Sequence, residues 1–224
     1  MNLIKGNAEL HFATPTYSGK FAGAELLNAQ LKNLFLEYER TKVGNKEPMN
    51  TTLGNIFDSE ADIFNLPDAP VRQLREMMHG IMSSWVKQVN NYSEQEFNQL
   101  KFRYESWFHI TRKGGCKTLH NHGNFSWAMV YYVEAGGESP KNFPRSGMIQ
   151  FYDPRRVNQN NWEAGLKGLN SQAKLGGFSL KPEAGSFIIF PGYVDHEVLT
   201  YHGDSERIMV AVNCSVVTPD APAL

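Results

Sequence analysis

Residues 117–137, KTLHNHGNFSWAMVYYVEAGG, place two histidines one position apart directly before an aromatic run that is typical of a β-strand. Alternate side chains of an extended chain point the same way, so the rings of His120 and His122 can converge on one metal ion. Surface loops also carry such pairs by chance. A third ligand elsewhere in the chain is therefore needed to decide between these two interpretations.

The chain after residue 100 has the period of β-strands. Its short segments are rich in β-branched and aromatic residues and are separated by Gly, Pro, Asn and Asp: FRYESWFHITR, SWAMVYYVEA, GMIQFYDPR, GFSLKPEAGSFIIFPG, HEVLTYHG and ERIMVAVNCSVV. Strands at this spacing predict an antiparallel sandwich or barrel, and the double-stranded β-helix, a cupin-like jelly roll, is the version that commonly carries a metal in its mouth. The strand-poor stretch 155–177 is then expected to be an insertion loop near that mouth.

The chain before residue 99 has the period of helices instead. Apolar residues recur at three and four positions over 23–40, and a second helix is expected over 68–90, with Asp68 as N-cap and Pro70 in its first turn. The stretch between them has the composition of an irregular connection. We therefore expect a mainly β protein in which a helical part, 1–98, packs on a β core, 99–224, as one unit. The helices are expected to cover the sheet or to form a homodimer contact.

Composition excludes several classes of partner. The 224 residues carry a formal net charge of -1, without the basic excess that nucleic acid or an anionic membrane surface would require. Cys116 and Cys214 form neither a disulfide framework nor a CxxC metal signature, which fits a reducing compartment. No stretch is typical of a signal peptide or a membrane span, so we expect a cytoplasmic protein with no membrane partner.

A third ligand candidate follows the apolar stretch that ends in FPG. His196 stands there at the start of the next strand pair, and Arg207 comes eleven residues later at the edge of the apolar run IMVAVN. A buried arginine without a carboxylate is costly, and its planar guanidinium is suited to binding a carboxylate at two points. The alternative is an ion pair with Glu206 or Asp204, but those two are expected to lie in a solvated hairpin.

At these residues the sequence resembles the 2-oxoglutarate and iron(II)-dependent oxygenases, and in particular a bacterial and phage branch of them. The matching segments, within residues 100–217, are SWFHITRKGGCKTLHNHG, MVYYV, IQFYDPR, AGSFIIFPGYVDHEV and ERIMVAVN. The resemblance implies that iron(II) binds at the positions of His120, His122 and His196. It also implies that 2-oxoglutarate chelates the iron and places its far carboxylate on Arg207.

The resemblance includes two departures from the family's pattern. His122 stands where the family usually has Asp or Glu, and Met209 stands where many relatives have a serine that assists the arginine. Three ligand sets stay open: three histidines, two histidines with water, or a shifted frame in which His122 and Asn124 are the ligands. We favour three histidines, because imidazole ligates iron directly and an amide is a weak ligand.

Alternation along the last strand places Met209, Ala211 and Asn213 on the face of Arg207, so we expect Asn213 to line the cosubstrate site. Further candidates for the pocket wall are Asn124, Trp127, Tyr131 and Met209. The remaining histidines, His11, His79, His109 and His202, are expected to have structural or solvated roles.

The implied activity is that of a dioxygenase that hydroxylates a C–H bond and releases succinate and carbon dioxide. The substrate would be a peptidyl residue such as proline, or a small metabolite, and no catalytic residue beyond the metal site is required. The alternative from another class is a metal-binding cupin-type jelly roll without oxygenase activity. A third hypothesis is an inactive member that serves as a binding module.

Overall fold

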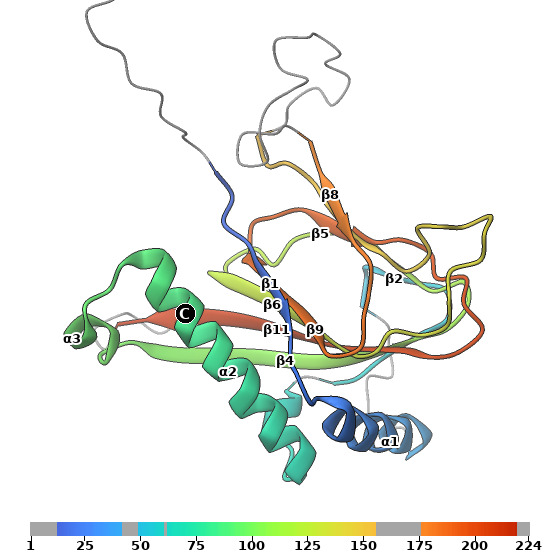
Figure 1. Ribbon diagram of the computed structural model, residues 1–224, viewed down its shortest axis with the longest axis horizontal. Coiled ribbons are helices and arrows are strands. Elements are labelled where there is room, and N and C mark those ends of the chain that lie inside the picture. Colours follow the sequence, from blue (N-terminus) through green and yellow to red (C-terminus); the bar gives the residue numbers. More distant parts are fainter. Residues whose placement is uncertain (1–12, 42–48, 61, 156–175, 219–224) are drawn as a thin grey trace, which may run out of the picture.

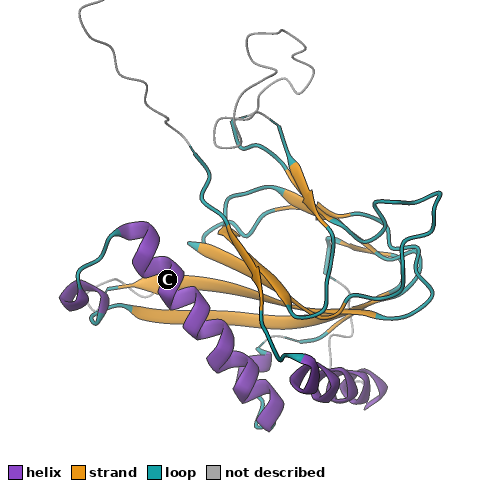
Figure 2. Cartoon of the chain, in the orientation of Figure 1, coloured by secondary structure: helices purple, strands orange, loops and turns teal. Residues whose placement is uncertain are grey.

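The computed structural model describes residues 13–41, 49–60, 62–155 and 176–218, in which two antiparallel sheets face each other and the long helices lie on one outer side (Figure 1; Figure 2). The elements in chain order are β1 (Tyr17–Lys20), α1 (Glu25–Thr41), β2 (Thr52–Leu53), β3 (Ile56–Asp58), η1 (Ile63–Asn65), α2 (Ala69–Asn90), α3 (Glu94–Phe97), β4 (Lys101–Thr111), β5 (Cys116–His120), β6 (Trp127–Glu134), β7 (Ile149–Phe151), β8 (Phe178–Leu180), β9 (Ser186–Pro191), β10 (His196–Val198) and β11 (Arg207–Val217).

The larger sheet has the strand order β1-β9-β6-β11-β4-β3, and the smaller has the order β2-β5-β10-β7-β8. Figure 1 shows α1 and α2 on the outer side of the larger sheet and the smaller sheet on its other side. This arrangement confirms the mainly β jelly roll with N-terminal helices that the strand pattern predicts. It also gives the larger sheet two buried faces.

Strand β11 shows how one sequence serves both faces. Its even-numbered residues, Ile208, Val210, Val212 and Cys214, pack in the core between the sheet and the helices, and Met209 and Ala211 pack in the core between the two sheets. Because successive side chains of a strand point to opposite faces, Arg207 and Asn213 lie on the same side as Met209. The face predicted for these four residues is therefore confirmed.

The helices form because their apolar residues follow the helical period. Helix α1 buries Leu27, Leu31 and Phe35, and α2 buries a stripe of five residues from Val71 to Val86. Asp68 is the N-cap of α2, as predicted, although its carboxylate makes no capping bond and accepts the Tyr38 hydroxyl instead. Among the described helices, none is both long and apolar enough to cross a bilayer.

The N-terminal part is less purely helical than predicted. Strand β1 pairs with β9, β2 pairs with β5, and β3 pairs with β4, so the expectation of an irregular connection between the helices is wrong for β2, β3 and η1. The boundary between 1–98 and 99–224 stays a prediction, and these strand pairs support one compact unit. The predicted insertion loop falls mostly in 156–175, outside the described residues.

Candidate metal and carboxylate site

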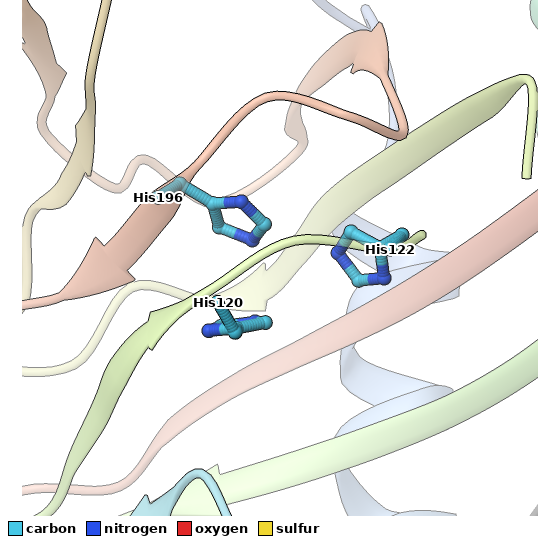
Figure 3. Close-up of side chains that lie close together, drawn as sticks. All are labelled: His120, His122 and His196. Carbon is cyan, nitrogen blue, oxygen red and sulfur yellow. The ribbon is translucent and has the colours of Figure 1, made fainter. Parts of the chain in front are cut away.

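Three histidine rings converge between the two sheets. The ligand nitrogens of His120, His122 and His196 all lie within 4.8 Å of one another, and Figure 3 shows the three rings facing a common space. The ring centroids of His120 and His196 are 4.3 Å apart, and those of His122 and His196 are 5.1 Å apart. His196, which the sequence predicted as the third ligand, thus lies close enough to His120 and His122 for all three to bind one metal ion.

Backbone pairing brings these side chains together. His120 ends β5 and His196 begins β10, and the two are register partners in the smaller sheet. His122 follows β5, where its backbone N–H donates to the Gly192 carbonyl at 2.7 Å. A Cβ on Gly192 would lie 2.1 Å from the Phe125 carbonyl oxygen, so the turn before His196 can approach the His122 segment only because residue 192 is glycine.

Two of the three rings are oriented by backbone carbonyls two residues earlier in the chain. The Nδ1–H groups of His120 and His196 donate to the carbonyls of Thr118, at 2.6 Å, and Val194, at 3.0 Å. This fixes the tautomer that leaves Nε2 with a free lone pair. Burial, together with the neighbouring His120, lowers the pKa of His122 to about 4 and that of His196 to about 3, and burial also lowers the pKa of His120. All three rings are therefore neutral near pH 7, as metal ligands must be.

Arg207 is a buried cation without a counter-ion. It is 1% exposed, and its Nε and Nη2 atoms have no hydrogen-bond partner among the described residues. Its Nη1–H donates only to the Met209 sulfur, at 3.5 Å, and a thioether is a weak acceptor. Met209 is therefore the neighbour of the arginine, and it leaves most of the guanidinium available.

The alternative ion pairs of Arg207 do not form. Glu206 lies 3.6 Å from Arg112, and Asp204 lies 3.3 Å from Lys113, both near the surface. No carboxylate within the described ranges pairs with Arg207, so the interpretation of this residue as half of a structural ion pair is wrong.

Tyr132 completes this end of the site, although the sequence pointed to Tyr131. The Arg207 guanidinium lies 5.0 Å from the centroid of the Tyr132 ring, and the Tyr132 hydroxyl is buried without a hydrogen-bond partner in the part of the chain that the structure describes. A phenol O–H and two guanidinium N–H groups without acceptors match the oxygens of a carboxylate. The residues present therefore fit a dicarboxylate bound at one end by Arg207, and three neutral imidazoles fit a divalent iron ion.

A second charged cluster lies beside the site. Asp58 and Lys117 form a buried ion pair at 2.8 Å, and the Asp58 carboxylate also accepts the Nδ1–H of His109. The Trp107 indole N–H in turn donates to His109 Nε2 at 2.8 Å. Burial and the charge of Lys117 lower the pKa of His109 to about 4, against the effect of Asp58. A neutral His109 thus links the ion pair to Trp107, whose ring centroid is 6.1 Å from that of His122.

The three histidines line a cavity of about 460 Å³, and among the described residues neither Arg207 nor Tyr132 belongs to its lining. Its wall includes the three converging histidines, Met209 and Asn213 from the predicted set, together with Trp107, His109, Lys117 and Glu105. The predictions for three other residues are wrong. Trp127 and Tyr131 point into the core under the helices, where the Tyr131 hydroxyl donates to Asn28, and Asn124 is exposed and does not line the cavity.

Sequence reasoning missed Tyr132, Lys117 and Asp58, and it gave His109 only a structural role. The residues of β6 that pack between the two sheets are even-numbered, and Tyr132 among them pairs with Met209 of β11. Counting back from Arg207 through that pairing would have selected Tyr132 instead of Tyr131. No comparable signal existed for Asp58, because it comes from a strand of three residues.

The comparisons with known proteins agree with this geometry. Residues 105–213 match a family model described as "Putative 2OG-Fe(II) oxygenase". No curated protein sequence matches the chain. Among solved structures, a Pseudomonas putida prolyl-4-hydroxylase has a TM-score of 0.59 at 14% identity, with 90% of this chain and 92% of that chain covered. The α-ketoglutarate-dependent carbocyclase SnoK from nogalamycin biosynthesis has a TM-score of 0.61 at 9% identity, with 90% and 79% covered.

At these identities the two structures establish the fold alone, and the family model carries the assignment. The matched region contains His120, His122, His196 and Arg207, and the family uses iron(II) and 2-oxoglutarate. Residues 105–213, just under half of the chain, thus match the family of 2-oxoglutarate and iron(II)-dependent oxygenases.

Proposed function

We propose that the protein is an iron(II)- and 2-oxoglutarate-dependent dioxygenase that hydroxylates a C–H bond of a peptidyl residue or small metabolite, releasing succinate and carbon dioxide. The observation that carries this proposal is Arg207, a buried cation with unpartnered donors on the strand face that leads to three neutral histidines. A cupin-type protein without a dicarboxylate cosubstrate would have no use for such an arginine.

The proposed function gives each residue of the candidate site a role. His120, His122 and His196 would hold the iron, and Arg207 with Tyr132 would bind the far carboxylate of 2-oxoglutarate. The bound iron would supply the oxidising power for attack on a C–H bond, at the expense of the cosubstrate and dioxygen. The apolar wall beside Met209 and Trp107 keeps water from the cosubstrate, which strengthens the interaction of its carboxylate with the guanidinium.

The substrate class is part of the proposal as well. A cavity of about 460 Å³ has room for a side chain or a small metabolite rather than an extended polymer. One of the structural neighbours, from Pseudomonas putida, is a prolyl-4-hydroxylase, so a proline-containing peptide is the first substrate to test.

The test is an anaerobic titration of the apo-protein with iron(II) and then 2-oxoglutarate. The visible metal-to-ligand charge-transfer band is used to monitor binding. We expect a band with the wild type, and a weaker one with His122→Ala and with Arg207→Ala. Oxygen-dependent succinate formation from the same sample then tests the reaction. A band that never appears would contradict the proposal and favour a cupin-type or inactive binding protein.

A further inference from the structure

The three histidines differ in what holds their rings. His120 and His196 each donate an Nδ1–H to a backbone carbonyl two residues earlier, whereas no backbone carbonyl of the described residues accepts from the His122 ring in this way. The His122 ring is confined by packing instead, with ring centroids of Trp107 and Phe190 at 6.1 Å and 5.9 Å. The residue that stands in place of the usual carboxylate is thus the one whose tautomer is not fixed by the backbone.

Asn213 lines the same cavity as the His122 ring and carries an unused acceptor. It is 6% exposed, and no group in the described part of the chain forms a hydrogen bond with its buried Oδ1 atom. A buried amide oxygen without a donor costs about 1–3 kcal/mol.

A ligating histidine needs such an acceptor, and a carboxylate does not. An imidazole binds metal through one nitrogen, and the proton on its other nitrogen must be donated to a fixed group if the ring is to keep its orientation. A histidine at position 122, where the family usually has Asp or Glu, therefore needs one acceptor, and Asn213 on β11 of the facing sheet is a buried acceptor that lines the same cavity.

We propose that Asn213 is a positioning residue for His122: its side-chain oxygen accepts the N–H of the imidazole nitrogen that does not bind the metal. This inference rests on the proposed function, in which His122 is an iron ligand. It revises the expectation that Asn213 binds the cosubstrate. Glu105, its register partner on β4, also lines the cavity, and a carboxylate there would repel the carboxylates of 2-oxoglutarate.

The experiment is a double-mutant cycle on iron(II) affinity, measured anaerobically by equilibrium competition with a chelator. The proteins are wild type, Asn213→Leu, His122→Ala and the double variant. We expect Asn213→Leu to weaken iron binding about 10- to 100-fold in the wild-type background. In the His122→Ala background, Asn213→Leu should change the iron(II) affinity less than about twofold, because the imidazole through which Asn213 acts is missing.

Two further variants separate positioning from folding. Asn213→Asp keeps an acceptor at the same place and should retain iron binding within about threefold. Ser215→Ala removes a buried polar group from the same face of β11, two residues further on, and should leave iron affinity unchanged. In the zinc(II)-loaded protein, the His122 ring N–H should give a slowly exchanging NMR signal that is present in the wild type and Asn213→Asp and absent in Asn213→Leu.

The outcomes distinguish this inference from the function on which it rests. An equal loss of affinity on Asn213→Leu in both backgrounds, or no loss in either, would overturn the positioning role. Wild-type iron affinity in His122→Ala would also overturn it, while leaving the proposed oxygenase with a two-histidine site. Absence of both iron binding and the 2-oxoglutarate band in the wild type would overturn the inference together with the proposed function.

Discussion

Lys117 and Arg207 are both buried in the β core, at 5% and 1% exposure, yet their surroundings are opposite. Lys117 donates to Asp58 and to Thr52, so its charge is neutralised within the protein. No carboxylate among the described residues pairs with Arg207, whose guanidinium contacts the Met209 thioether and lies over the Tyr132 ring. A buried cation that is paired with a carboxylate of the protein therefore has a structural role, whereas one without a carboxylate indicates a binding site for an anionic ligand.

The largest effect is expected where the internal ion pair is broken. Asp58→Ala leaves Lys117 buried and unpaired and also removes the acceptor of His109, so we expect a loss of about 3–5 kcal/mol in the free energy of unfolding. Urea denaturation measures it. The control is Asp204→Ala, whose partner Lys113 is exposed. A loss no larger than that of the control would show that the pair is not structural.

The next effect falls on ligand affinity instead of stability. Arg207→Met removes a cation that has no internal partner, so the apo-protein should be at least as stable as the wild type. Its affinity for 2-oxoglutarate, measured by anaerobic titration of the charge-transfer band, should fall by about 2–3 kcal/mol, or roughly 30- to 150-fold. Iron(II) affinity should be unchanged. A large loss of stability in this variant would contradict the comparison of the two cations.

A pH effect of similar size is expected at His109, because burial, Lys117 and Arg207 all lower its pKa, which is about 4 in the folded protein. An unfolded histidine has a pKa near 6.5, so His109 contributes stability above that pH and loses it as the pH falls toward 4. We expect the apo-protein to lose about 2 kcal/mol from this group between pH 7 and pH 5.

The matched variant for this effect is His109→Gln. Glutamine can donate to Asp58 and accept from Trp107 but does not titrate. Urea unfolding of the two proteins at both pH values should therefore show a smaller decrease in the variant. Equal decreases would mean that His109 is not held neutral by its surroundings.

The smallest effect is expected at the surface. Glu206→Gln removes one partner of Arg112 and should cost under about 1 kcal/mol in unfolding free energy. The 2-oxoglutarate titration should be the same as in the wild type, because Glu206 does not pair with Arg207. A change of more than about twofold in cosubstrate affinity would revive the ion pair that the sequence left open.

Much of the fold could be predicted because its signals are local. The helices follow their apolar period, and the core strands are bounded by Gly, Pro, Asn and Asp. Strands β2 and β3, of two and three residues, are too short to show a period, and pairing with β5 and β4 creates them. Tertiary contacts thus determined these two strands, which the local β-propensity of the sequence did not predict.

The same distinction applies to the candidate site. Arg207 was visible because a charge in an apolar run is rare, and the histidines were visible through spacing and resemblance. The sequence did not show which way Tyr131 points, because nearly every residue of β6 is buried on one face or the other. Apolar and aromatic residues occupy both its odd-numbered and its even-numbered positions. The cluster of Asp58, His109 and Lys117 joins three strands by side-chain contacts that leave no periodic trace.

The pairing of His120 with His196 has a consequence for how the chain matures. The two residues are far apart in sequence, and contacts of high sequence separation form late, after the loop between them has closed. A chain emerging during synthesis would present the first two histidines long before the third. Tight iron binding would therefore require that the last strands have already docked. The fraction of newly synthesised protein that binds iron can then be used to follow the completion of folding.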